Sequence, residues 1–290
     1  MRVVALELRI RYGRLEYRPG AARDGAFLVP SVDKVMKSTP ANVFPVLLAL
    51  LFTAGTLRAE SASFLIGKGD LFDANRQANE ALKYYLLAEK LDPNNARLLV
   101  DMSREYRRLM SNATDPAEKV RLGGIAVDYA NRATALAPKD PEAHLAVAIS
   151  YGELQSFQGN RQRFEAVHII KDAVDKVIEL DPLNDLAWHV LGRWYKGLAE
   201  VDAFHRALAQ AAFGGLPAAT YEEAATCFEK AIQLNPERPI HYIELGCVCA
   251  QMGRKDEARR LITKGLDMPD PKKEDPKTRR EGEQLLDNLR

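Results

Sequence analysis

The chain has few cysteines and almost no net charge. Its 290 residues contain three cysteines, and 41 basic side chains nearly balance 40 acidic ones, which gives a formal charge of +1. Cys227, Cys247 and Cys249 form no CxxC pair, which excludes a disulfide framework and a zinc finger, and we expect all three to fill small spaces in a core. Because the charge is balanced, no global field attracts the protein to nucleic acid.

The sequence also lacks the motifs of the common catalytic sites. It contains no phosphate-binding glycine loop, no HExxH and no GxSxG, and its five histidines are scattered over different helical patterns. No segment alternates apolar and polar residues between turn signals, so we predict essentially no β-sheet. These absences predict an all-α protein that is not an enzyme and that needs no metal and no cofactor.

The apolar run near the N-terminus is too short to cross a bilayer. It extends from Val43 to Leu57, whereas a spanning helix needs roughly 20 residues. Met36 and Lys37 precede it, and the segment ends in the small-residue site Leu57-Arg58-Ala59, which is the layout of a secretory signal. We therefore predict a disordered or untranslated extension over 1–35, a signal-like segment over 36–59, and a secreted or periplasmic folded domain over 60–290. The alternative is a genuine extension with a buried helix or membrane anchor, in a membrane-anchored or cytoplasmic protein.

A proline-ended phrase recurs along the rest of the chain as "KLDPNNA", "ALAPKDPEA", "ELDPLNDLA" and "QLNPERPIH". In each phrase one helical pattern stops at the proline and another begins. Between the last two phrases, the spacing of a first helix, Trp-x2-Leu-Gly-x2-Tyr, is followed by that of a second helix, Ala-x3-Phe, and by a closing proline. The matching residues, which we predict to form the core of this repeat, are Trp188, Leu191, Gly192, Tyr195, Ala224, Phe228, Ala231 and Pro236.

This pattern is that of tetratricopeptide repeats, in which small residues let two helices approach and bulky residues fill the spaces between turns. One helix pair cannot bury its apolar face, so several pairs must stack. We predict an all-α, tetratricopeptide-like helical-repeat solenoid with inserted helical segments. Its C-terminal stretch, "DPKTRREGEQLLDNLR", has leucines on one side and is expected to form a capping helix.

The stretch from Leu191 to Pro236 resembles the regulator of microtubule dynamics family. The similar features are a Leu-Gly-Arg-Trp helix, a helical insertion with an arginine and a phenylalanine, a proline loop and Thr-Tyr-Glu-Glu-Ala. The matching positions are Leu191, Gly192, Arg193, Trp194, Arg206, Phe213, Pro217, Thr220, Tyr221, Glu222, Glu223 and Ala224. The resemblance implies a non-enzymatic helical-repeat domain that binds partners. It also implies microtubule association in some members and phospholipid contact in a membrane-tethered member.

Two basic clusters are the candidate binding residues. In a helical-repeat array the first helix of each pair lines the inner wall, and residues three or four apart share a helix face. The residues predicted to face a groove and hold a carboxylate or phosphate are Arg104, Arg107, Arg108, His189, Arg193 and Lys196. The alternative is that these side chains pair with Asp101, Glu105 or Glu153 and only keep the surface soluble.

Two functions follow from this arrangement. The first is a scaffold whose groove binds a protein or peptide partner through an acidic or C-terminal anchor. The second is a phospholipid-binding or lipid-transfer module. In it the insertion over 197–215, with apolar residues such as Phe204 and Leu208, forms an extra helix that partly lids a basic groove.

Overall fold

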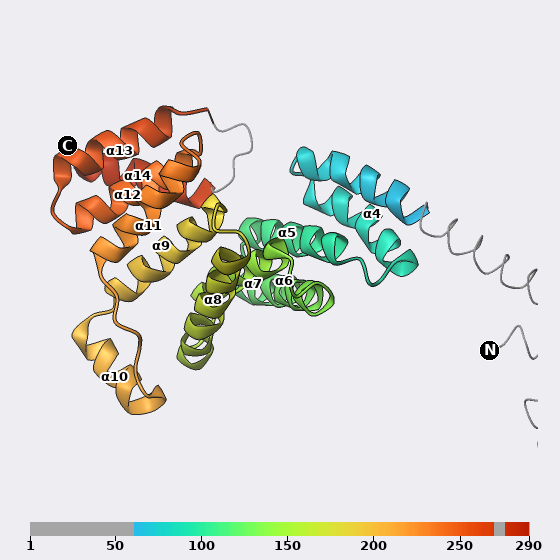
Figure 1. Ribbon diagram of the computed structural model, residues 1–290, viewed down its shortest axis with the longest axis horizontal. Helices are drawn as coiled ribbons and strands as arrows, with labels where there is room; N and C mark the ends of the chain where they lie inside the picture. Colours follow the sequence, from blue (N-terminus) through green and yellow to red (C-terminus); the bar gives the residue numbers. More distant parts are fainter. Residues whose placement is uncertain (1–60, 270–275, 290) are drawn as a thin grey trace, which may run out of the picture. The chain divides into compact units, whose positions relative to one another are not determined.

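The computed structural model describes residues 61–269 and 276–289, and within them all regular secondary structure is helical (Figure 1). This confirms the predicted all-α class. The segments predicted as an extension and a signal lie outside the described residues, so their boundaries stay predictions.

The described part of the chain begins with helical residues 61–74. The helices that follow, in chain order, are α4 (Ala78–Leu91), α5 (Ala96–Asn112), α6 (Pro116–Leu136), α7 (Pro141–Leu154), the 3-10 turn η1 (Gln155–Phe157), α8 (Asn160–Leu180), α9 (Asp185–Ala199), α10 (Ala203–Phe213), α11 (Tyr221–Leu234), α12 (Pro239–Gln251), α13 (Lys255–Asp267) and α14 (Pro276–Asn288).

These helices pack as successive pairs. The pairs are α5 with α6, α7 with α8, α9 with α11, and α12 with α13, and each second helix also contacts the first helix of the next pair. Helical residues 61–74 and α4 form an earlier pair, in which the rings of Phe72 and Tyr84 stack 5.5 Å apart. The last helix, α14, packs on α12 and α13. This confirms the predicted tetratricopeptide-like array.

The connectors between pairs explain where the helices stop and start. They cover residues 92–95, 137–140, 181–184 and 235–238, four residues each, and every one contains a recurring proline. After three of these prolines, Asn95, Asp140 or Asn184 caps the next helix by accepting a hydrogen bond from a backbone N–H. Thr220 and Glu223 form the predicted capping box before α11. The added length of the earlier pairs lies partly in long second helices, since α6 and α8 have 21 residues each.

The predicted core of the fourth pair is present, with one change. A Cβ on Gly192 would lie 2.9 Å from the ring of Phe228, which is fully buried together with Ala224 and Ala231. Trp188 belongs to a different hydrophobic cluster, which extends through the preceding pairs, and its Nε1 donates to the carbonyl of Pro182.

The remaining predicted members of this core occupy supporting positions. Leu191 is buried, Tyr195 packs against two hydrophobic clusters, and the carbonyl of Pro236 accepts a hydrogen bond from Tyr242. The three cysteines are free and buried, in agreement with their expected role as small core residues. The tryptophan-containing stretch of α9 is therefore a packing element.

The insertion forms the predicted extra helix, and its role as a partial lid on the groove stays a prediction. This helix, α10, packs on α8, a second helix, through stacking of Phe213 on Phe164 at 5.0 Å. The guanidinium of Arg206 donates to the carbonyls of Leu198, Val201 and Pro217 and so fixes the base of the insertion. A contact with an aromatic side chain outside the insertion thus contributes to the position of α10.

Gly246 provides a test of the close packing between α12 and α13. A Cβ at this position would lie 3.0 Å from the carbonyl oxygen of Ala258 and 3.1 Å from the nitrogen of Ile262, both of them backbone atoms. We predict that Gly246→Ala lowers the free energy of unfolding by about 1–3 kcal/mol, because the two helices must separate. The measurement is urea unfolding of the full chain.

Gly124→Ala in α6 is the matched control, because a Cβ there would meet nothing within 4 Å. It should leave the protein unchanged or stabilise it by about 0.5–1 kcal/mol through better helix propensity. Equal effects of the two substitutions would contradict close packing at Gly246.

Candidate ligand-binding surface

The first helices of successive pairs lie next to one another. Contacts join α5 to α7, α7 to α9, and α9 to α12. In a stack of helix pairs this row forms the inner wall, so we call the exposed side of helical residues 61–74, α5, α7 and α9 the first-helix surface. All six predicted binding residues lie on α5 or α9.

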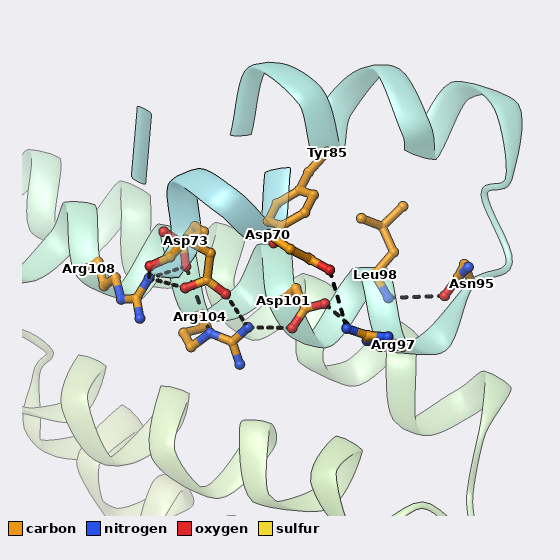
Figure 2. A network of polar contacts seen from close by, with 10 residues as sticks. Asp70, Asp73, Tyr85, Asn95, Arg97, Leu98, Asp101, Arg104 and Arg108 are labelled. Atoms are coloured by element: carbon orange, nitrogen blue, oxygen red, sulfur yellow. Dashed lines mark hydrogen bonds and ion pairs between the residues drawn. The ribbon is translucent and has the colours of Figure 1, made fainter. Parts of the chain in front are cut away.

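An ion-pair network joins helical residues 61–74 to α5 (Figure 2). Asp73 accepts hydrogen bonds from Arg104, at 2.7 Å, and from Arg108. Arg104 also pairs with Asp101, and Arg108 pairs with Glu105 at 2.6 Å. Two of the predicted cations are thus held between carboxylates of their own helix and one carboxylate of the first helix of the preceding pair.

A second set of contacts extends this network toward the start of α5. The hydroxyl of Tyr85 on α4 donates to Asp70 at 2.8 Å, and Arg97 reaches the other oxygen of Asp70 at 3.3 Å (Figure 2). Arg97 is largely exposed, whereas Tyr85 is fully buried. The network therefore extends from the core to solvent.

Burial and charge act in opposite directions on the carboxylates of this network. Burial raises the pKa of Asp73, but the neighbouring charges of Arg104 and Arg108 outweigh it and hold that pKa below its ordinary value. Burial raises the pKa of Glu105 to about 7, because the nearby Arg108 and Arg104 do not compensate for complete removal from water and for the charge of Asp73.

Arg107 differs from the other two predicted arginines of α5. Its side chain is 13% exposed, and its Nη1 lies 3.5 Å from an Oε1 of Glu153 on α7. Its Nε is buried and has no hydrogen-bond partner among the described residues. Burial lowers the pKa of Arg107, and the nearby charges of Arg104 and Arg108 lower it further.

A second network joins α9, α12 and α14. Lys196 donates to Glu244 at 2.9 Å, the Nε of Arg193 lies 3.6 Å from the other carboxylate oxygen, and Thr278 donates to Glu244 at 3.3 Å. Glu244 is only 2% exposed. Burial raises the pKa of Glu244, but Lys196 and Arg193 outweigh it and lower that pKa to about 2.

His189 does not lie on an exposed face, so its predicted placement on the groove wall is wrong. Its side chain is buried with 3% exposure, and its ring meets the ring of Phe228 edge to face at 5.4 Å. The Nδ1 atoms of His189 and His241 are 3.0 Å apart, and the Nε2 of His241 lies 2.9 Å from Asp185. The packing of α9 against α11 and α12 removes His189 from solvent.

The sequence therefore predicted the cations better than their partners. Arg104 with Arg108, and Arg193 with Lys196, converge as expected, and the alternative pairing with Asp101, Glu105 and Glu153 is also present. The unpredicted members of the two networks are Asp70, Asp73, Tyr85, Arg97, Glu244 and Thr278. The contacts of His189 with His241, and of His241 with Asp185, were not predicted either. One available signal was Glu244, a carboxylate within the otherwise apolar pattern of α12. Ligand binding by any of the six residues stays a prediction.

Neither a metal site nor a spanning helix is found in the part of the chain that the structure describes. Within 61–269 and 276–289, no three histidine, cysteine, aspartate or glutamate side chains are grouped to hold a metal ion. None of the helices in these ranges has the length and apolar character needed to cross a membrane.

Stacked helix pairs with an ion-paired row of first helices define a helical-repeat protein of the tetratricopeptide type. The family model described as regulator of microtubule dynamics protein 1-3 matches residues 65–290, and the chain belongs to this family. This confirms the resemblance seen in the sequence.

Curated relatives and a solved structure agree with this assignment. Regulator of microtubule dynamics protein 1 of Bos taurus is 31% identical over 70% of this chain and 65% of its own length, so the match covers less than two thirds of that relative. The Mus musculus protein of the same name is 29% identical over 71% of this chain and 68% of its own length. The thermophilic TPR protein TTC0263 of Thermus thermophilus has a TM-score of 0.58 at 16% identity, covers 79% of this chain with 98% of its own, and supports the fold alone.

We predict that the free energy of unfolding of the Glu105→Gln variant increases, relative to that of the unmodified protein, as the pH rises from about 5 to about 8. The folded protein keeps a proton on Glu105 up to a pKa of about 7, whereas the unfolded chain releases it near 4.5, so rising pH favours unfolding. Glutamine does not titrate. Over this range the variant should become more stable relative to the unmodified protein, by on the order of 1–2 kcal/mol.

Urea unfolding at several pH values measures this shift. Glu179→Gln, which changes an exposed ion pair with Lys176, is the control and should show no such trend. A pH-independent difference for Glu105→Gln would show that Glu105 is ionised in the folded protein.

We also predict that Glu244→Gln lowers the free energy of unfolding at pH 7 by about 3 kcal/mol, because it leaves the part-buried Lys196 without its counter-charge. The same unfolding measurement, again with Glu179→Gln as the control, checks this expectation. A loss as small as that of the control would mean that the network contributes nothing to stability.

Proposed function

We propose that the protein is a non-catalytic scaffold that binds a protein or peptide segment on its first-helix surface. The observation that carries the proposal is that this surface presents exposed charges of both signs. Arg97 is largely exposed, and Arg193 and Glu153 are partly exposed. An extended peptide offers backbone donors and acceptors together with charged side chains, so it complements such a surface.

The alternative, a phospholipid-binding or lipid-transfer module, draws less support from the described residues. An acyl chain needs an enclosed apolar cavity. The charged contacts of α5 and α9 give the first-helix surface a polar character, and α10 packs on a second helix. A hollow of about 500 Å³ borders α6, but it is open to solvent and does not enclose an acyl chain. Native mass spectrometry of the purified full chain would reveal a bound phospholipid and so favour this alternative.

Location and microtubule association are separate proposals. The layout of 36–59 favours export, whereas the names of the relatives favour microtubules, and an exported protein does not meet cytoplasmic microtubules. N-terminal sequencing of the protein from its source tests export. Co-sedimentation of the full chain with polymerised tubulin tests microtubule binding.

Peptide selection tests the scaffold proposal directly. Random peptides are displayed and selected on the full chain, and the affinities of enriched peptides are measured by fluorescence polarisation. The double variant Arg97→Gln, Arg193→Gln removes two charges of the first-helix surface. It should weaken peptide binding by roughly tenfold.

The matched control removes two exposed positive charges from second helices, Lys83→Gln with Arg161→Gln. It should change affinity by less than about twofold. Failure to enrich any peptide, or equal losses in the two variants, would contradict a peptide site on the first-helix surface.

A further inference from the structure

The three arginines of α5 that were predicted to bind a ligand, Arg104, Arg107 and Arg108, are not equivalent, and the difference singles out one of them. Arg104 contacts Asp73 and Asp101, and Arg108 contacts Asp73 and Glu105, so each holds two carboxylates at short range. These two guanidinium groups join helical residues 61–74 to α5. An incoming anion would have to displace buried carboxylates to reach them, which is costly.

Arg107 has no comparable set of partners. Within the described residues the one carboxylate at salt-bridge distance is Glu153, at 3.5 Å, which is too long for a strong charge-assisted hydrogen bond. A guanidinium carries five N–H donors, and the buried Nε of Arg107 makes no hydrogen bond to any residue that the structure describes. A desolvated cation with unused donors is unfavourable, so a further acceptor would stabilise it.

The charges around Arg107 strengthen this conclusion. Arg104 and Arg108 act on it from the same helix, Glu105 lies on the same helix, and Glu153 faces it from α7. The two neighbouring arginines and the burial lower its pKa, whereas the two carboxylates raise it, and the net direction is downward. The cation is therefore incompletely neutralised where it stands.

We infer that Arg107 is the anchor for a single carboxylate of the bound peptide, and that Glu153 occupies this place when no ligand is present. The inference rests on the proposed peptide-binding function and names the ligand group that the surface selects. Glu153 is 37% exposed and stays hydrated when it turns away, whereas Arg107 is held among the helices. The exchange replaces the long Arg107–Glu153 contact by a short, bidentate contact between Arg107 and the carboxylate of the peptide.

A carboxylate fits this position better than a phosphate. Glu105 and Glu153 both lie close enough to Arg107 to affect its charge, and they repel an incoming anion more strongly if it carries two charges. One guanidinium also matches the two oxygens of one carboxylate. The expected ligand group is an aspartate, a glutamate or a free C-terminus.

The test uses acetate and inorganic phosphate as probes on the full chain at constant ionic strength. The NMR signal of the Arg107 Nε–H, assigned by its loss in Arg107→Gln, is followed during titration. Acetate should shift this signal in a saturable manner. Glu153→Gln should tighten acetate binding by roughly threefold to tenfold, because the internal competitor loses its charge.

Arg161 and Glu165 on α8 provide a matched control, since they form an exposed pair at 3.0 Å. Glu165→Gln should leave the acetate titration of Arg107 unchanged. If Arg107 only stabilised α5 against α7, Glu153→Gln would weaken the protein without increasing any affinity for acetate. That result, or saturable binding of phosphate with none of acetate, would overturn the assignment.

The results of the two experiments test the carboxylate site at Arg107 separately from the proposed peptide-binding function. Peptides that bind the first-helix surface but lose no affinity in Arg107→Gln would reject the anchor and keep the scaffold. Acetate binding at Arg107 without any enriched peptide would reject the scaffold and keep the anion site.

Discussion

The stack depends on glycines at which neighbouring helices touch. A Cβ on Gly265 of α13 would lie 2.8 Å from the carbonyl oxygen of Pro239, and one on Gly192 would enter the ring of Phe228. At Gly246 the obstacle is again backbone, that of α13. Because only glycine permits these distances, the spacing between helices is set by residue type. The approach of neighbouring helices also removes Glu105 and Glu244 from water.

Most charges on the first helices therefore serve the protein itself. Asp73 joins two helices through Arg104 and Arg108, and Glu244 joins α9 to α14 through Lys196 and Thr278. A buried carboxylate is tolerated only when such partners are present, so these residues cannot easily be spared for a ligand. For the proposed peptide site, specificity would come from cations whose internal pairing is incomplete, because they gain most from an external carboxylate.

Features that depend on local sequence spacing could be predicted, whereas contacts between different helices could not. Helix ends, caps and the packing of Phe228 on Gly192 depend on local spacing and could be predicted. The pairs Asp73–Arg104 and Lys196–Glu244 join different helices, and no local pattern fixes which turn meets which. The place of α10 depends on an aromatic side chain of α8, outside the insertion. The burial of His189 was within reach, because it precedes Gly192 by three residues and so shares the face expected to approach Phe228.

The equal length of the connectors between pairs has a consequence for how this architecture can change. Each of them spans four residues, whereas the link inside the α9/α11 pair is long enough to contain all of α10. Lengthening a connector between pairs would alter the rotation from one pair to the next and displace everything downstream. Lengthening a link inside a pair adds material at the periphery and leaves that rotation intact. New structural elements can therefore be acquired within a repeat, while the junctions between repeats preserve the helical path of the whole array.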